Sequence, residues 1–158
     1  MAISPYLARL RARVGTELLL VPSATGIMYD PENRVLLVRQ RADGLWSTPG
    51  GAIEPDETPA DAVVREVREE TGLETQAVRL IGAIGGPSFV VRYGNGDCTQ
   101  YVTIVFECAI IGGTLRADND EVSEAAFFSR DEAERAVTQE WLLSLLPRLF
   151  DRSAAPFF

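Results

Sequence analysis

The sequence predicts an α/β domain in which a mixed β-sheet is covered by helices. Two observations support this fold class. Short runs rich in β-branched and aromatic residues alternate with a few helix-like segments, and one of these segments carries a full set of helix start and stop signals. With 158 residues, 46% of them hydrophobic, the chain suits one domain over residues 1–158 with a substantial core.

The amino-terminal part opens with a helix signal, because Ser4 can cap a helix over residues 4–14 and Pro5 suits its first turn. Apolar and β-branched runs then predict three strands, and turn-forming residues at 30–33 separate the last two. These strands are expected at residues 17–21, 24–29 and 34–39.

The clearest element is a helix over residues 59–71. Thr58 suits the N-cap, Pro59 the first helical position and Asp61 the acidic partner of a capping box. Gly72 suits the carboxy-terminal stop. Small and β-branched residues recur along one side and predict the face that packs on the core: Ala60, Val63, Val64 and Val67.

The carboxy-terminal half continues with strands and ends in helices. Asn95-Gly96 is a strong signal for a tight hairpin between two strands. The expected strands lie at residues 77–84, 89–92, 100–111 and 124–129, and the expected helices at 130–137 and 138–150. Residues 151–158 are expected to form a frayed tail.

Composition excludes several classes of site. The chain has no histidine, which removes histidine-dependent nucleophilic triads and histidine-bound zinc. Its net charge of −8 disfavours broad binding to nucleic acid. Cys98 and Cys108 lack metal-ligand spacing, which favours reduced thiols in the cytoplasm. We see no signal peptide or apolar run of transmembrane length, so we expect a cytoplasmic protein that does not engage a membrane.

Three glutamates on the predicted helix are the most informative feature. Glu66, Glu69 and Glu70 stand at i, i+3 and i+4, so they project from one helix face. Like charges at this spacing destabilise a helix by roughly 0.2–0.5 kcal/mol per pair. One interpretation is a solvated acidic face; the other is a site for a hard divalent cation, to which the bare Gly50 carbonyl could also reach. Carboxylates without histidine suit Mg²⁺ or Mn²⁺ better than a soft metal.

The segment from Gly51 to Leu73 also matches a longer pattern, with Glu57 six positions after the glycine and the run REVREETGL from Arg65. It resembles the complete signature of the Nudix hydrolases, G-x5-E-x7-R-E-U-x-E-E-x-G-U, in which U is aliphatic. The resemblance covers about residues 24–132. It implies an α/β/α sandwich, a Nudix hydrolase domain with the signature helix on one face of a mixed sheet.

The resemblance implies a nucleotide diphosphatase, a hydrolase of phosphorus-containing acid anhydrides that requires Mg²⁺ or Mn²⁺. Glu66 is expected to bind metal and to help remove the proton of the attacking water. Arg65 is expected to orient a glutamate, and Glu57 to support the site through water or Arg68. The implied metal ligands are the Gly50 carbonyl, Glu57, Glu66, Glu69 and Glu70.

Family members often recruit a further acid from a loop, and the acidic stretch before the last predicted strand offers three candidates: Asp118, Asp120 and Glu121. Glu121 is the strongest of them because it comes just before that strand. The alternative is a loop of solvated charges, which is common at protein surfaces.

Substrate recognition rests on weaker signals. Arg39 and Arg41 end a strand just before the signature and could hold a phosphate, or else be surface arginines. Phe89, Tyr93 and Tyr101 could stack on a base, or else pack on the sheet.

Pro87 lies near where ADP-ribose-cleaving family members carry a proline. We therefore favour a nucleoside diphosphate linked to another group, such as ADP-ribose or a nucleotide sugar. Nucleoside triphosphates and dinucleoside polyphosphates stay open as substrates. The alternative function is a non-catalytic, nucleotide-sensing module. The isoprenoid diphosphate isomerases that share the fold use histidine in their metal site, which this chain lacks. A homodimer is also expected, partly from the apolar side of helix 4–14 at Leu7 and Leu10.

Overall fold

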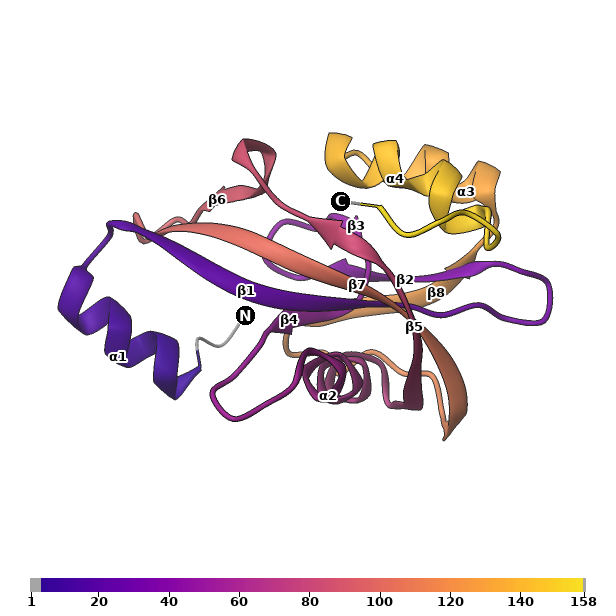
Figure 1. Ribbon diagram of the computed structural model, residues 1–158, viewed down its shortest axis with the longest axis horizontal. Coiled ribbons are helices and arrows are strands. Elements are labelled where there is room, and N and C mark those ends of the chain that lie inside the picture. Colours follow the sequence, from indigo (N-terminus) through magenta and orange to yellow (C-terminus); the bar gives the residue numbers. More distant parts are fainter. Residues whose placement is uncertain (1–3, 158) are drawn as a thin grey trace.

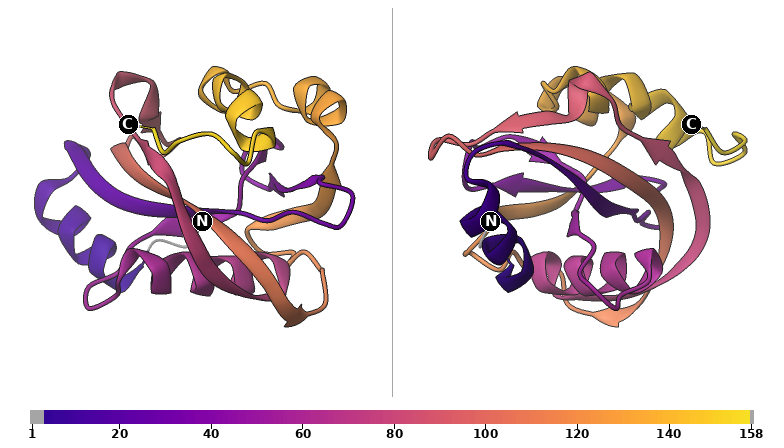
Figure 2. Two further views of the ribbon diagram at one scale, coloured as in Figure 1. Left: turned by 45° about the vertical axis from the view of Figure 1, so that its right-hand side comes forward. Right: turned by 60° about the vertical axis from the view of Figure 1, so that its left-hand side comes forward.

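Two β-sheets lie between helices on either side, in a computed structural model that describes residues 4–157 (Figure 1). The helix α2 (Pro59–Thr71) covers one side, and α3 (Arg130–Ala136) and α4 (Glu140–Phe150) cover the other, as Figure 2 shows from two further directions. The helix α1 (Pro5–Val14) stands beside one end of the sheets. The predicted α/β/α class is confirmed. Residues 1–3 of the predicted domain and Phe158 of its predicted tail lie outside the described residues.

The strands are β1 (Leu18–Ile27), β2 (Val35–Gln40), β3 (Trp46–Ser47), β4 (Gly50–Ala52), β5 (Leu73–Ile84), β6 (Val90–Arg92), β7 (Cys98–Gly113) and β8 (Val122–Phe128), with a short 3₁₀ helix at Pro87–Phe89. The larger sheet has the order β4-β1-β7-β5, with β6 also paired to β7, and the smaller has the order β3-β2-β8. β1 and β7 run parallel, whereas the other pairs are antiparallel. The sheet is therefore mixed, as predicted.

The strand pattern differs from the prediction in two places. One continuous β1 replaces the strands expected at 17–21 and 24–29, because its pairing with β7 runs unbroken past Pro22. β1 and β2 belong to different sheets, so the expected pairing around residues 30–33 is reduced to a bridge between Tyr29 and Val35. The chain thus crosses from the larger sheet to the smaller at this turn.

The helix α2 begins and ends where the sequence predicts. The Thr58 hydroxyl accepts a hydrogen bond from the Asp61 amide, and the Asp61 carboxylate accepts one from the Thr58 amide. Gly72 ends the helix in a left-handed conformation with φ of 69°. Capping of this kind contributes about 1 kcal/mol, and it fixes the register in which the three glutamates lie along one cleft.

The hydrophobic core has two halves, one on each side of the sheets, and β2 contributes side chains to both halves. Leu36 packs in the half that contains Val63 and Val67 of α2. Leu37, the next residue, packs in the half that contains Leu142 of α4, because successive strand side chains point to opposite faces. The predicted apolar face of α2 at Val63 and Val67 is confirmed, since both side chains are fully buried.

The carboxy-terminal tail is attached to β5 rather than frayed. The Phe157 amide donates to the Ile81 carbonyl at 3.2 Å, and the Phe157 carbonyl accepts from the Ala83 amide at 3.0 Å. Arg152 binds the Glu107 carboxylate, and its guanidinium lies 4.5 Å from the centre of the Tyr29 ring. These partners are distant in sequence, so the local composition of the tail gives no sign of them.

Replacing Glu107 with glutamine is expected to destabilise the fold at neutral pH. Burial opposes the charge of Glu107, but hydrogen bonds from Arg79 and Arg152 outweigh it and hold the pKa of Glu107 below its ordinary value. Because the folded pKa is lowered, this contribution is present at pH 7 and is lost as the pH falls below about 4 toward the folded pKa. We expect a loss of roughly 1.5–3 kcal/mol in urea unfolding at pH 7 that shrinks in acid.

The matched control is Glu134→Gln, which removes only an exposed ion pair with Arg130 and should cost less than about 1 kcal/mol. A difference between wild type and Glu107→Gln that does not change with pH would contradict the assigned pairing.

Candidate functional site

A cleft of about 770 Å³ lies beside the acidic face of α2. Its walls come from α1, β1, β7, the hairpin before β7 and the loop before β8. The cleft brings together Glu66, Glu69 and Glu70 of the predicted helix cluster and Glu121 of the predicted acidic loop. Residues far apart in the sequence therefore meet at one opening.

Glu70 is the most deeply buried member of the cluster, with 2% of its surface exposed. Its Oε2 accepts a hydrogen bond from the Gly50 amide at 3.0 Å. Burial raises the pKa of Glu70 to about 8, although the Gly50 amide and Gln40 offset part of the shift. Its other oxygen, Oε1, is buried with no hydrogen-bond partner of normal geometry among the described residues. A buried carboxylate oxygen without a partner is costly, and a ligand that binds it would remove that cost.

Glu66 lies against the backbone of Gly51. A Cβ atom placed on Gly51 would stand 2.5 Å from the carboxyl carbon of Glu66, so only glycine leaves room for this carboxylate. Burial raises the pKa of Glu66 despite its hydrogen bond with Arg65, and the charges of Glu69 and Glu121 add to the shift. The glycine and the glutamate that the Nudix signature separates by 14 residues are thus neighbours in space.

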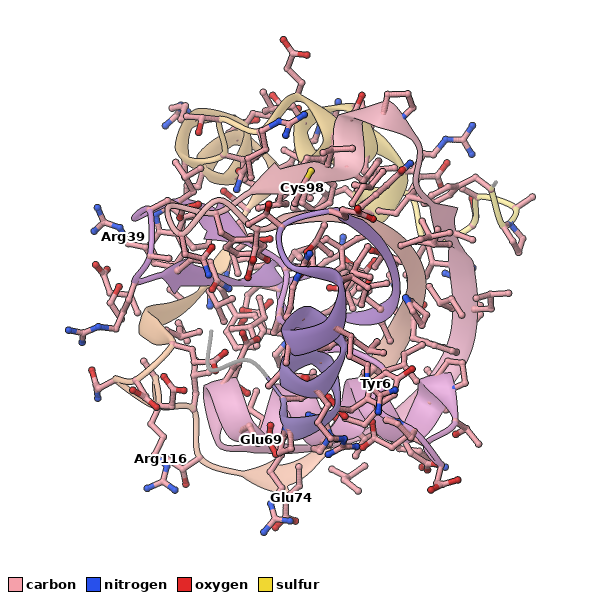
Figure 3. All side chains as sticks on the ribbon, turned by 90° about the vertical axis from the view of Figure 1, so that its left-hand side faces the viewer. Tyr6, Arg39, Glu69, Glu74, Cys98 and Arg116 are labelled. Carbon is pink, nitrogen blue, oxygen red and sulfur yellow. The ribbon has the colours of Figure 1, made fainter. Side chains whose placement is uncertain are left out.

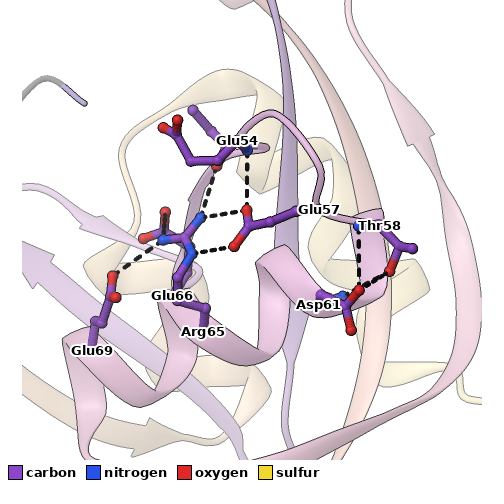
Figure 4. A network of polar contacts seen from close by, with 8 residues as sticks. Glu54, Glu57, Thr58, Asp61, Arg65, Glu66 and Glu69 are labelled. Carbon is purple, nitrogen blue, oxygen red and sulfur yellow. Dashed lines mark hydrogen bonds and ion pairs between the residues drawn. The ribbon is translucent and has the colours of Figure 1, made fainter. Parts of the chain in front are cut away.

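Arg65 joins the acids into one network (Figure 4). It donates two hydrogen bonds to Glu57, at 2.6 and 2.9 Å, and one each to Glu66 at 2.8 Å and Glu69 at 3.2 Å. These bonds raise the pKa of Arg65, with Glu57 contributing most, and hydrogen bonding to Arg65 lowers the pKa of Glu57. Glu57 therefore supports the cluster through Arg65, and among the described residues no hydrogen bond or ion pair joins it to Arg68, which was one of the two routes predicted.

The loop before β8 is fixed by Asp118. The Asp118 carboxylate accepts hydrogen bonds from the amides of Asp120, Glu121 and Val122, so it shapes the turn rather than standing free. The Arg41 amide donates to the Glu121 carbonyl at 2.9 Å and its side chain donates to the Asn119 carbonyl at 3.1 Å. This loop is how Glu121 reaches the cleft, where its charge raises the pKa of both Glu66 and Glu70.

Three of the five residues predicted to contact substrate lie outside the cleft lining. Arg39 pairs with Glu124 and the Gly44 carbonyl, and Figure 3 shows it pointing outward at the edge of the molecule. Arg41 is engaged with the acidic loop, and Phe89 packs on Trp141 with 5.4 Å between ring centres. Tyr101 does line the cleft, where its hydroxyl lies 2.7 Å from that of Tyr93.

The acids of the cleft supply only oxygen donors, which suits Mg²⁺ or Mn²⁺. Among the described residues, no three acidic or sulfur-bearing side chains stand in an arrangement that would hold an ion as they are placed. Arg65 donates hydrogen bonds to Glu66 and Glu69, while one Glu70 oxygen has no partner of normal geometry among the described residues. The donor chemistry fits a hard cation. To bind one, Glu66 and Glu69 would have to give up their hydrogen bonds with the Arg65 guanidinium or bind both partners at once.

The amino-terminal helix is the part of the site that sequence reasoning missed. Ser4, Leu7 and Arg11 line the cleft, yet only the apolar side of this helix was noted, as a possible surface for a second subunit. The hairpin at Tyr93–Asp97 forms the tight turn that Asn95-Gly96 predicts, and it also lines the cleft. None of the described helices is long and apolar enough to cross a membrane.

Comparisons with known proteins give a consistent result. A sequence model of the NUDIX domain matches residues 19–149. The chain is 31% identical to a MutT-like protein of Streptomyces ambofaciens over 127 residues, which are 80% of this chain and 75% of the relative. It is 37% identical to an ADP-ribose pyrophosphatase of Methanocaldococcus jannaschii over 104 residues, 64% of this chain but only 57% of that protein.

The fold has counterparts among solved structures. An ADP-ribose pyrophosphatase from Streptococcus suis matches with a TM-score of 0.68 at 25% identity, over 85% of this chain and 92% of the other. The arrangement of the helices around the sheets is therefore a known architecture.

Proposed function

Because this chain belongs to the Nudix family of pyrophosphohydrolases, we propose that it cleaves the diphosphate linkage of a nucleoside diphosphate joined to another group, with Mg²⁺ or Mn²⁺ as cofactor. The observation that carries the proposal is the meeting of Glu66, Glu70 and Glu121 at one cleft, where one buried Glu70 oxygen has no hydrogen-bond partner of normal geometry among the described residues. Water is added across the P–O–P bridge, and two phosphorylated products leave.

We assign each side chain a role from its contacts. Glu66 and Glu70 would hold the cation, with Glu69 and the Gly50 carbonyl as further ligands. Arg65 orients Glu66 and Glu69, and Glu57 fixes the guanidinium that does so. Glu66 also accepts the proton of the attacking water, and Glu121, held across the cleft by the Asp118 turn, is the second candidate for that step.

The bound cation would polarise a phosphoryl oxygen and offset the charge of the diphosphate. The remaining work falls to the protein. The cluster is enclosed enough to raise the pKa of Glu66 and of Glu70 mainly by burial, so charge interactions there are stronger than in bulk water. The helix α2 and the Asp118 turn already bring the acids to one cleft, so only their side chains need to rearrange when a cation binds.

ADP-ribose and nucleotide sugars are the proposed substrate classes. The relative from Methanocaldococcus jannaschii and the structural counterpart from Streptococcus suis are both named ADP-ribose pyrophosphatases. A nucleotide-sensing module without activity is the alternative, and it would have less need of the full set of Glu66, Glu69 and Glu70. A homodimer stays a prediction. Leu7, one of the two leucines on the apolar helix side proposed as the dimer surface, lines the cleft.

The proposal predicts metal-dependent hydrolysis. Purified protein is incubated with ADP-ribose, ADP-glucose and other nucleotides, with Mg²⁺ or Mn²⁺, and the products are separated by chromatography. We expect AMP and a sugar phosphate with metal, and loss of turnover when EDTA is in excess. Saturable nucleotide binding by calorimetry, without product over the whole panel, would instead establish the sensing module.

A further inference from the structure

The cleft extends well beyond the glutamate cluster, into what we call the α1 compartment. Leu7 of α1, Leu19 and Val21 of β1, and the tyrosines Tyr93 and Tyr101 line it. These five side chains are apolar or aromatic, in contrast to the acidic face of α2, although Asn95, Asp97 and Thr99 also line the cleft. The Tyr93 and Tyr101 hydroxyls are 2.7 Å apart and hydrogen-bonded to each other, which fixes the two rings as one wall.

The helix α1 is held in place chiefly through Arg11, and not by a core of its own. No residue of α1 is fully buried, so its apolar side is open to the cleft. The Arg11 guanidinium donates to the Glu17 carbonyl at 2.6 Å, the Cys98 carbonyl at 2.7 Å and the Thr99 hydroxyl at 2.8 Å. Arg11 is thus committed to anchoring α1 and is not available to bind a phosphate.

Charge restricts what the compartment can accept. Within the described lining, eight acidic side chains face two arginines, Arg11 and Arg65, and both arginines already bind protein oxygens. A cation at the glutamates would neutralise one diphosphate, but no protein cation of the described lining remains for additional phosphates. Each extra phosphate in the α1 compartment would meet apolar surface and negative charge, which disfavours its binding.

We propose that the α1 compartment binds an uncharged ring of the substrate, so that the enzyme selects a single diphosphate joined to a neutral group over longer polyphosphate chains. The inference rests on the proposed hydrolase function and specifies its substrate class. The neutral ring is either the nucleobase or the distal sugar. Either ring could contact Leu7 and the two tyrosines, since stacking and apolar contact do not require charge.

The test introduces a positive charge at Leu7. In Leu7→Arg, we expect kcat/KM for ATP to rise relative to kcat/KM for ADP-ribose by roughly fivefold, the scale of one partly exposed ion pair. KM for ADP-ribose should rise with kcat nearly unchanged, since the lost contact is made in the ground state and the transition state alike. The matched control is Leu10→Arg on the same helix, outside the cleft lining, which should leave the ratio unchanged.

Two further measurements distinguish a bound nucleobase from a bound sugar, and the compartment inference from the hydrolase proposal. If Leu7→Ala weakens the binding of ADP-glucose and of UDP-glucose to different extents, the nucleobase occupies the compartment. If it weakens the binding of ADP-ribose and of ADP-glucose to different extents, the distal sugar occupies it. Calorimetric binding of a non-hydrolysable α,β-methylene analogue of ADP-ribose tests the compartment even if turnover fails. Equal preference of the wild type for ATP and ADP-ribose, or identical behaviour of Leu7→Arg and Leu10→Arg, would overturn the inference while leaving the hydrolase proposal intact.

Discussion

Replacing Glu70 with glutamine is expected to lower kcat for diphosphate hydrolysis by roughly 100-fold or more without destabilising the fold. Glutamine has nearly the same shape, and its carbonyl oxygen can still accept the Gly50 amide, so the local hydrogen bond is retained. The buried negative charge is removed, and with it the ligand proposed for the cation. Because that charge is disfavoured by burial in the metal-free protein, the melting temperature should stay the same or rise.

Glu66→Gln is expected to have a comparable effect on kcat, since Glu66 is assigned both a ligand role and a proton-accepting role. Turnover with ADP-ribose and Mg²⁺ is measured together with thermal unfolding in the absence of metal. Glu74→Gln, an exposed position on β5 outside the cleft lining, is the control and should retain activity. Near-normal turnover in both Glu70→Gln and Glu66→Gln would sink the assigned roles, whereas a large fall in the melting temperature of Glu70→Gln would make Glu70 a structural residue.

Local signals predicted the centre of the site well. The bounds of α2 follow from Thr58, Asp61 and Gly72, whose capping interactions involve residues within a turn of one another. The family assignment rests on the same short segment and is confirmed by the NUDIX match over residues 19–149. A further acid from the loop before β8 was expected from the resemblance to the Nudix family rather than from local signals, and Glu121 lines the same cleft as the helix acids.

Contacts between distant segments explain the failures. Nothing near Arg41 in the sequence shows that it would bind the loop at Asn119, and nothing near Phe89 shows that Trp141 would cover it. The tail was expected to fray because chain termini are often poorly ordered, yet Phe157 pairs with the backbone of β5. The same reason hid the α1 compartment: Leu7 and Tyr101 become neighbours of one cleft only after β1 and β7 have paired in parallel.

Two adjacent glycines are expected to respond differently to the same substitution. Gly50 has φ of 152°, and a Cβ there would lie 2.3 Å from the Ala24 carbonyl oxygen and 2.7 Å from the Thr25 Cα. Backbone atoms cannot move aside cheaply, so Gly50→Ala should destabilise the fold by roughly 3 kcal/mol or more, from strain and overpacking together. Chemical unfolding measures this loss. Activity should fall because less of the protein is folded and because the hydrogen bond from the Gly50 amide to Glu70 is displaced.

Gly51→Ala should instead spare stability and damage the chemistry. Its Cβ would lie 2.5 Å from the Glu66 carboxyl carbon, which is the far end of a flexible side chain and can rotate away. We expect kcat to fall roughly 10- to 100-fold, because a misplacement of about 1 Å at a reacting group has effects of this size, while unfolding changes by less than about 1 kcal/mol. Wild-type turnover in Gly51→Ala would show that Glu66 does not act from its position against this glycine.

A double variant separates a steric cause from a general loss of the site. Glu66→Asp shortens the side chain by one methylene and alone should lower kcat, since the carboxylate is withdrawn from the cleft. Combined with Gly51→Ala, it removes atoms from the space that the new Cβ needs. The loss of kcat in the double variant, expressed as a free energy, should therefore be smaller than the sum of the losses in the two single variants. Strict additivity would mean that the alanine acts through the backbone of β4 and not through the Glu66 carboxylate. Coupling between these two positions would instead show that the glycine at the start of the Nudix signature makes room for the first glutamate of the helix cluster.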